Sequence, residues 1–285
     1  MIMQFKRPEL RAGVLIAVSL TIVSSGRFAD AKANSILPPQ GQEDVAKEDG
    51  QARIEAATKM NEGIKAFGDQ KYDAAAQFFE KAVQLDPAFE TARMYLATAY
   101  MSQFVPGSTD SKNEEMAQRA IKTFEEIVAR AEDPAKPNKN AMISIASLYY
   151  QLKEHDESKY WCGRILQIDP QSAEAYYRIA VIDLEDALEK TGIRGENVEY
   201  LSPEDRTRTQ ANIDEGLTSL DKALEIRPDY FDAMSYQNLL LREKAKLEED
   251  EWTKAELIRQ ANLLSQKALA LELKAREEEA KKSKE

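Results

Sequence analysis

The sequence predicts an all-α protein built from repeated pairs of helices, and two observations support this prediction. Of its 285 residues, 43% are hydrophobic and 31% are charged, while only 11 are Gly and 10 are Pro. This composition is typical of a helix-rich globular protein. One segment pattern also occurs three times, as YDAAAQFFEKAVQLDP at 72–87, HDESKYWCGRILQIDP at 155–170 and IDEGLTSLDKALEIRP at 213–228. Each copy ends on a proline, which lacks a backbone N–H and therefore ends a helix.

The pattern is clearest in the unit that ends at Pro87. Reading back from it, the unit contains Ala82, Phe79, Ala75, Tyr72 and Gly63. We expect the small residues to let two antiparallel helices approach closely, and Phe79 to fill the gap to the next unit. The spacing Gly-x8-Tyr-x2-Ala-x3-Phe-x2-Ala-x4-Pro resembles the tetratricopeptide repeat, a helix–turn–helix unit of about 34 residues. The resemblance implies a helical-hairpin solenoid that winds as a right-handed superhelix.

The same frame predicts about five repeats over residues 54–272, with a capping helix at the C-terminal end. After the first unit, further units are expected to begin at Glu90, residue 139, Ala173 and near Phe231. Residues 273–285 are predicted to form a charged tail. The terminal unit matches the pattern least well, as expected where a stack must present a polar outer face.

Two insertions interrupt the frame, near residues 103–113 and 185–209. After the second insertion, a helix is expected over 203–226, because Ser202 can cap it and Pro203 suits its first turn. Both insertions are consistent with extended helices joined by loops. They are equally consistent with a rim over one face of the solenoid.

Residues 1–31 have the pattern of a bacterial secretory signal peptide. Basic residues precede an uncharged apolar run at 12–23, and small residues surround possible cleavage sites after Ala31 and Ala33. The run is shorter than the roughly 20 residues that span a bilayer, so an uncleaved membrane anchor is the alternative. We therefore expect an exported protein, periplasmic or secreted, with a flexible leader over residues 32–53.

Charge and residue inventory argue against several classes of function. The formal net charge of −11 disfavours binding to nucleic acid and to membrane lipid. One Cys and one His cannot form an intramolecular disulfide, and they supply too few ligands for a zinc site. The two, His155 and Cys162, are separated by about 10 Å of helix rise, too far for a proton-transfer pair. We therefore expect no catalytic residue, no metal, no cofactor and no enzymatic activity.

The resemblance implies that the first helix of each unit lines a concave groove. The residues expected there are Met60, Ile64, Phe67, Met94, Thr98, Met101, Ile143, Ser147, Tyr150, Tyr177, Val181 and Leu184. Burial against neighbouring helices is the alternative for these residues. Met adapts to varied partners and Tyr combines an apolar body with a polar tip.

The expected function follows from this apolar groove. The sequence predicts an exported scaffold that binds a protein or peptide partner along the groove without catalysis. The alternative is a structural component of the cell envelope that associates with itself as a homo-oligomer. The sequence does not identify the partner.

Overall fold

The structure of the chain is a computed structural model that describes residues 40–282. Within these residues it contains ten α-helices, one short 3-10 helix and no β-strand. From residue 46 onward the described residues form one compact unit, which contains the repeats apart from the first six residues of the first helix. The predicted signal peptide at 1–31 and both possible cleavage sites lie outside the described residues.

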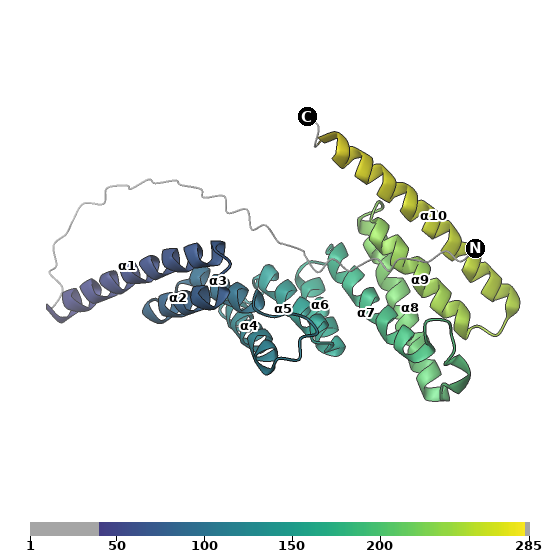
Figure 1. Ribbon diagram of the computed structural model, residues 1–285, viewed down its shortest axis with the longest axis horizontal. Helices are drawn as coiled ribbons and strands as arrows, with labels where there is room; N and C mark the ends of the chain where they lie inside the picture. The colour runs from purple at the N-terminus through teal and green to yellow at the C-terminus, as the bar shows by residue number, and fades with distance from the viewer. Residues whose placement is uncertain (1–39, 283–285) are drawn as a thin grey trace. The chain divides into compact units, whose positions relative to one another are not determined.

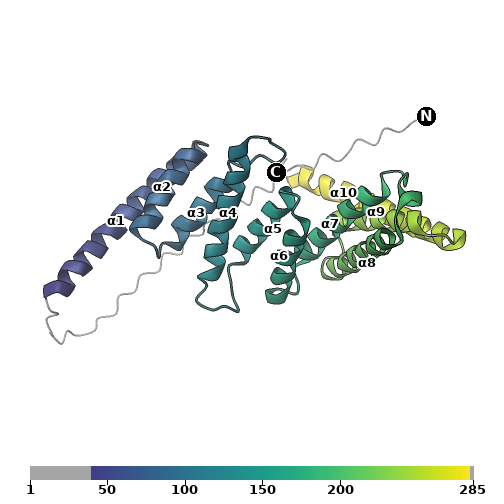
Figure 2. The ribbon, with the colours of Figure 1, turned by 90° about the horizontal axis from the view of Figure 1, so that it is seen from below.

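The helices form five consecutive hairpins (Figures 1 and 2). These are α1 (Gln40–Gly68) with α2 (Tyr72–Leu85), α3 (Glu90–Met101) with α4 (Ser111–Ala129), α5 (Lys139–Gln151) with α6 (His155–Ile168), α7 (Ala173–Thr191) with α8 (Pro203–Ile226), and α9 (Phe231–Leu247) with α10 (Glu251–Lys282). From α2 onward each helix packs on the next, and α7 also packs on α9. The predicted all-α fold and the predicted unit starts are confirmed.

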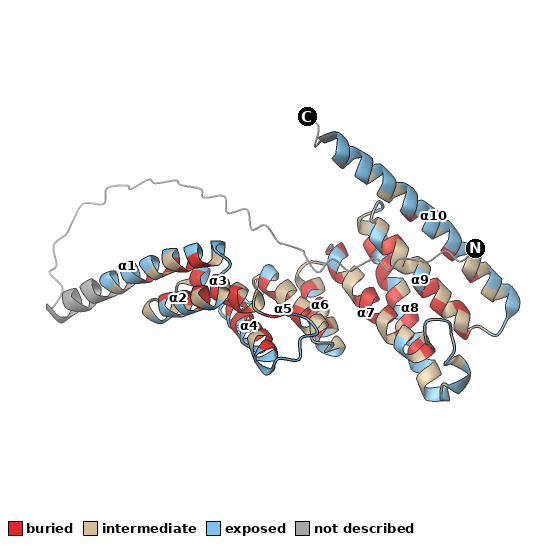
Figure 3. Ribbon diagram, in the orientation of Figure 1, coloured by how far each residue is buried: buried red, intermediate tan, exposed pale blue. Residues whose placement is uncertain are grey.

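The core lies between the helices, where the repeat frame places its packing residues (Figure 3). Phe79, Phe124, Cys162 and Leu220 occupy equivalent places in four second helices, and each is at most 1% exposed. The smaller frame residues Ala75, Ala82, Ala120 and Ala223 are also fully buried. The recurring pattern in the sequence therefore marks the buried face of each second helix.

The ends of the insertions are set by local capping. α8 begins at Pro203, as predicted, and the Ser202 side chain accepts a hydrogen bond from the Asp205 backbone N–H at 3.0 Å. Asp110 caps α4 in the same way through the Lys112 backbone N–H at 3.0 Å. Both insertions consist of lengthened helices and the segments that join them.

Each connecting loop is held by side chains of the repeats. In the first, Asn113 exchanges two hydrogen bonds with the Val105 backbone, at 2.6 and 3.0 Å. In the second, which includes the 3-10 helix η1 (Val198–Tyr200), Lys246 Nζ donates to the Gly192 and Ile193 carbonyl oxygens, each at 3.0 Å. The first loop is thereby tied to α4, which it leads into, and the second loop is tied to α9 of the following repeat.

Two predicted boundaries differ from the structure. α1 begins at Gln40, so residues 40–53 belong to a helix and not to a flexible leader. These residues include Glu, Ala, Lys and Arg, which favour helix and extend the first repeat toward the N-terminus. α10 continues to Lys282, so the charged tail is helical as far as that residue. None of the helices in residues 40–282 combines the length and the hydropathy that a membrane span requires.

Candidate functional site

The twelve residues predicted to line a groove lie on α1, α3, α5 and α7, and they differ in exposure. Ile64 is 41% exposed. Eight are partly buried, namely Phe67, Met94, Thr98, Met101, Ile143, Ser147, Tyr150 and Tyr177. The other three, Met60, Val181 and Leu184, are buried at 5, 6 and 3% exposure. The prediction that these three side chains are accessible is wrong. Neighbouring helices cover them.

Tyr177 belongs to an aromatic cluster between α7 and α9. Its ring centre lies 5.1 Å from those of Tyr230 and Tyr236, with the Tyr236 ring edge-on. Burial raises the pKa of all three phenols above the ordinary value, that of Tyr230 to about 12. Tyr177 thus links the fourth repeat to the fifth in addition to lying on the predicted face.

A second cluster surrounds Tyr150 and joins α5 to α7. The Tyr150 hydroxyl donates a hydrogen bond to Glu185, whose other carboxylate oxygen lies 2.9 Å from Lys153 Nζ. The guanidinium of Arg178 lies 5.6 Å from the centre of the Tyr150 ring. Burial first, and then Glu185, raises the pKa of Tyr150. This cluster places an aromatic ring and opposite charges at the contact between the third and fourth repeats.

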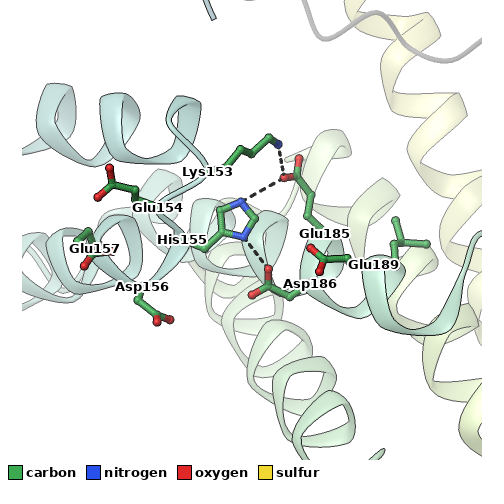
Figure 4. A pocket seen from close by; sticks show the side chains of 9 residues that line it. Lys153, Glu154, His155, Asp156, Glu157, Glu185, Asp186 and Glu189 are labelled. Carbon is green, nitrogen blue, oxygen red and sulfur yellow. Dashed lines mark hydrogen bonds and ion pairs between the residues drawn. The ribbon is translucent and has the colours of Figure 1, made fainter. Parts of the chain in front are cut away.

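The sole histidine of the chain, His155, lies in a pocket of about 860 Å³ at the start of α6 (Figure 4). Its Nδ1 lies 2.6 Å from Asp186 Oδ1 and its Nε2 lies 3.5 Å from Glu185 Oε2. The pocket also has the carboxylates of Glu154, Asp156, Glu157 and Glu189 around it. Its lining includes no Ser, Thr or Cys that could act as a nucleophile.

Cys162 does not supply the missing nucleophile. Its side chain is buried, and burial raises the pKa of the thiol to about 11. A thiol with so high a pKa is almost entirely protonated at neutral pH, and the thiolate is the reactive form. In the part of the chain that the structure describes, no three His, Cys, Asp or Glu side chains are placed to hold a metal ion.

A buried charge cluster connects α6, α7 and α8. Lys159 Nζ lies 2.7 Å from Asp183 Oδ1 and 2.7 Å from Glu215 Oε2. The Asp183 side chain is fully buried, and this burial raises its pKa to about 7, although Lys159 opposes the shift. Gly216 is packed against Asp183, since a Cβ added there would lie 3.1 Å from Asp183 Cβ. These contacts give the cluster a structural role.

Several residues of the face were missed from the sequence. Leu239, which is 42% exposed, stands at the ninth place of the fifth unit, equivalent to Ile64 in the first. The repeat frame could have identified Leu239 if it had been carried into α9. Glu185 stands at the thirteenth place of the fourth unit, which the family pattern also assigns to the groove, so the repeat frame could have identified it. Arg178 stands at the sixth place, for which the frame gave no signal.

Comparison with known proteins identifies the repeat and the fold. Residues 68–89 match the tetratricopeptide repeat family, and no curated protein matches the chain. Two crystal structures of MamA are similar, with 18% and 16% identity and TM-scores of 0.51 and 0.54. They cover 75% and 80% of this chain, and 96% of each MamA chain. A third similar structure is that of YrrB, described as a tetratricopeptide repeat protein with an unusual peptide-binding site. It is 17% identical to this chain with a TM-score of 0.47, and the match covers 80% of this chain and 96% of YrrB. The chain therefore contains a tetratricopeptide repeat and has the fold of a tetratricopeptide repeat protein.

Proposed function

We propose that the chain is a non-catalytic scaffold that binds a segment of a partner protein along its first helices, α1, α3, α5, α7 and α9. The observation that carries this proposal is the series of accessible apolar and aromatic side chains on these helices, including Ile64, Met94, Ile143, Tyr150 and Leu239. Methionines repack around varied partners, and a tyrosine adds a polar tip to an apolar contact. An extended or helical apolar segment has the matching chemistry.

The polar groups beside this series would orient the bound segment. Arg178 lies over the Tyr150 ring and forms no ion pair with another described residue. Its guanidinium is therefore available to donate hydrogen bonds to a carboxylate or a backbone carbonyl of the partner. The His155 pocket supports binding more than catalysis, because its imidazole is paired with Asp186 and has no nucleophile beside it.

Self-association is the second candidate, and exposed apolar residues at both terminal helices favour it. Ile54 on α1 is 65% exposed, and Leu263, Leu269 and Leu273 on α10 are 54, 56 and 51% exposed. Residues of this kind at the two ends of a repeat array can join one copy to another. Sedimentation of the purified protein over a range of concentrations separates this candidate from the first.

The proposed location is outside the cytoplasm. It rests on the basic residues, the apolar run and the small residues within the first 33 positions of the sequence. Cell fractionation followed by N-terminal sequencing tests it. A mature protein that begins at Lys32 or Asn34 in the periplasm or medium supports export, whereas a cytoplasmic protein that retains Met1 contradicts it.

Site-specific photo-crosslinking tests the proposed function. A photoreactive residue is placed at Ile64 or Ile143 on first helices, and at Gln77 or Gln118 as exposed controls on second helices. The proposal predicts that one protein is captured from both first-helix positions and from neither control. Capture of the chain itself at the first-helix positions would support self-association, and equal capture at all four positions would contradict a specific binding face.

A further inference from the structure

A second pocket, of about 590 Å³, lies between the end of α4, the connection to α5, the end of α5 and α6. Its walls include Pro134, Pro137, Tyr149, Tyr160 and Trp161. Tyr160 is 62% exposed, and its ring meets Trp161 edge-on with the ring centres 5.9 Å apart. We call this site the Tyr160 pocket. None of its residues belongs to the set that was predicted to line the groove.

The aromatic wall of the Tyr160 pocket already holds one cation. The guanidinium of Arg164 lies 4.6 Å from the centre of the Trp161 ring. At this distance the cation is attracted by the electron density of the ring face. Arg164 forms no ion pair within residues 40–282, so its charge does not neutralise a particular carboxylate there.

Two carboxylates, those of Glu125 on α4 and Glu157 on α6, line the Tyr160 pocket. Burial first, and then Glu125, Glu154 and Glu157, raises the pKa of Tyr149, so these three carboxylates act on its hydroxyl. Burial, followed by Glu157 and Glu114, also raises the pKa of Glu154. Glu125 and Glu157 thus line the pocket, and Glu114 and Glu154 add negative charge near it.

These carboxylates have no cationic partner, in contrast to the buried acids of the chain. Asp183 is paired with Lys159 at 2.7 Å, and Glu243 is paired with Lys246 at 2.6 Å. In the described residues, no ion pair involves Glu114, Glu125, Glu154 or Glu157. A cation that entered the Tyr160 pocket would reduce the repulsion among them. The pocket thus combines an aromatic surface with the two carboxylates of Glu125 and Glu157 and the single guanidinium of Arg164, so that its lining carries more negative than positive charge.

We propose that the Tyr160 pocket binds a lysine or arginine side chain from a basic segment of a partner protein. Aromatic faces attract such cations, and carboxylates form charge-assisted hydrogen bonds with them. The site lies on α4, α5 and α6 and uses none of the proposed first-helix contacts. This inference therefore holds or fails independently of the proposed function.

Trp161 provides a direct readout, because the chain has only two tryptophans. The other, Trp252, is 78% exposed on α10, so Trp252→Phe leaves Trp161 as the single reporter with little effect on folding. The probe is an acetylated and amidated peptide of three arginines separated by two prolines. The control peptide replaces each arginine by citrulline, which has nearly the same shape and no charge. We expect the arginine peptide to change Trp161 fluorescence and to bind at least tenfold more tightly than the control.

Substitutions in the pocket then locate the binding site. Glu125→Gln combined with Glu157→Gln should weaken binding of the arginine peptide at least tenfold. The matched control, Glu199→Gln with Glu204→Gln, removes two exposed charges elsewhere and should leave the affinity within twofold. Circular dichroism establishes that both variants are folded. Absence of binding, equal binding of the citrulline peptide, or equal weakening by both double variants would overturn the proposal.

Discussion

Gly63 on α1 lies directly against the ring of Phe79 on α2, so that a Cβ added at Gly63 would be 2.4 Å from Phe79 Cε1. Phe79 is fully buried. Its ring occupies the space that any larger residue at position 63 would require. The first hairpin therefore depends on the absence of a side chain at this position.

Replacement of Gly63 by Ala should destabilise the protein, although Ala favours helix by about 1 kcal/mol over Gly. Displacing the Phe79 ring from its site should cost about 1–3 kcal/mol. The matched control is Gly163→Ala on α6, where the added Cβ meets no atom within 4 Å. Urea unfolding should show a loss of stability for the first variant and a gain of up to about 1 kcal/mol for the second. A similar gain for both variants would contradict the close approach of α1 and α2.

The buried carboxyl of Asp183 should make stability depend on pH. In the folded protein the pKa of Asp183 is about 7, above its ordinary value of 3.8. Between these two pH values the folded state keeps the proton that the unfolded state has lost. The unfolding free energy should therefore fall as the pH rises from about 4 to about 7, by at most about 1.4 kcal/mol per pH unit. Asp183→Asn should remove this part of the dependence.

The control for this experiment is Asp229→Asn, an exposed carboxyl in the connection before α9. Unfolding free energies are measured by urea titration at pH 5 and pH 8 for the wild type and both variants. The difference between the two pH values should be smaller in Asp183→Asn than in the wild type, and unchanged in Asp229→Asn. Equal differences in all three proteins would show that Asp183 does not carry the effect.

Tyr177 should stabilise the contact between α7 and α9 through its ring. Tyr177→Ala removes contacts with both Tyr230 and Tyr236 and should cost about 2–4 kcal/mol. Tyr177→Phe retains the ring and removes only the hydroxyl, which is hydrogen-bonded to Tyr236, so it should cost about 0.5–1.5 kcal/mol. Thermal and urea unfolding measure both losses. If Tyr177→Ala were as stable as Tyr177→Phe, the aromatic cluster would not contribute to folding.

Lys246 should hold the loop between α7 and α8 in place. Lys246→Met removes its hydrogen bonds to the Gly192 and Ile193 carbonyls, and leaves the buried Glu243 without a cation. We expect a loss of about 1–3 kcal/mol and faster hydrogen exchange in residues 192–200. Lys244→Met is the control on the same helix, because its ion pair with Asp214 is partly exposed and should contribute less than about 1 kcal/mol. Unchanged exchange in the loop of Lys246→Met would contradict this role.

Helix boundaries were predictable wherever a local signal marks them. Pro203 begins α8 and Ser202 caps it, and both residue types are typical of the first positions of a helix. The repeat frame likewise identified Phe79 as a core residue, and Phe124 is buried at the equivalent place because each second helix repeats the same packing. The start of α1 lacked such a signal, since Gly50 and scattered charges at 40–53 obscure the helical pattern.

The exposure of side chains on the first helices was less predictable, because it depends on contacts between distant segments. The repeat frame placed Val181 and Leu184 on an accessible face, but α7 also packs on α9 and both residues are buried. The same holds for Asp183, whose partners Lys159 and Glu215 stand on two other helices. Sequence spacing along one helix carries no information on such contacts.

The central claim is that a partner protein binds the first-helix face, and the affinity of two matched variants tests it most directly. Ile64→Glu and Ile54→Glu introduce the same charge at exposed positions of the same helix, α1. Only Ile64 belongs to the proposed face. The ligand in this experiment is the partner protein that photo-crosslinking at Ile64 and Ile143 identifies. Calorimetric titration with it should show at least tenfold weaker binding for Ile64→Glu and less than a twofold change in affinity for Ile54→Glu. Unchanged affinity for Ile64→Glu, with the fold intact, would contradict the claim.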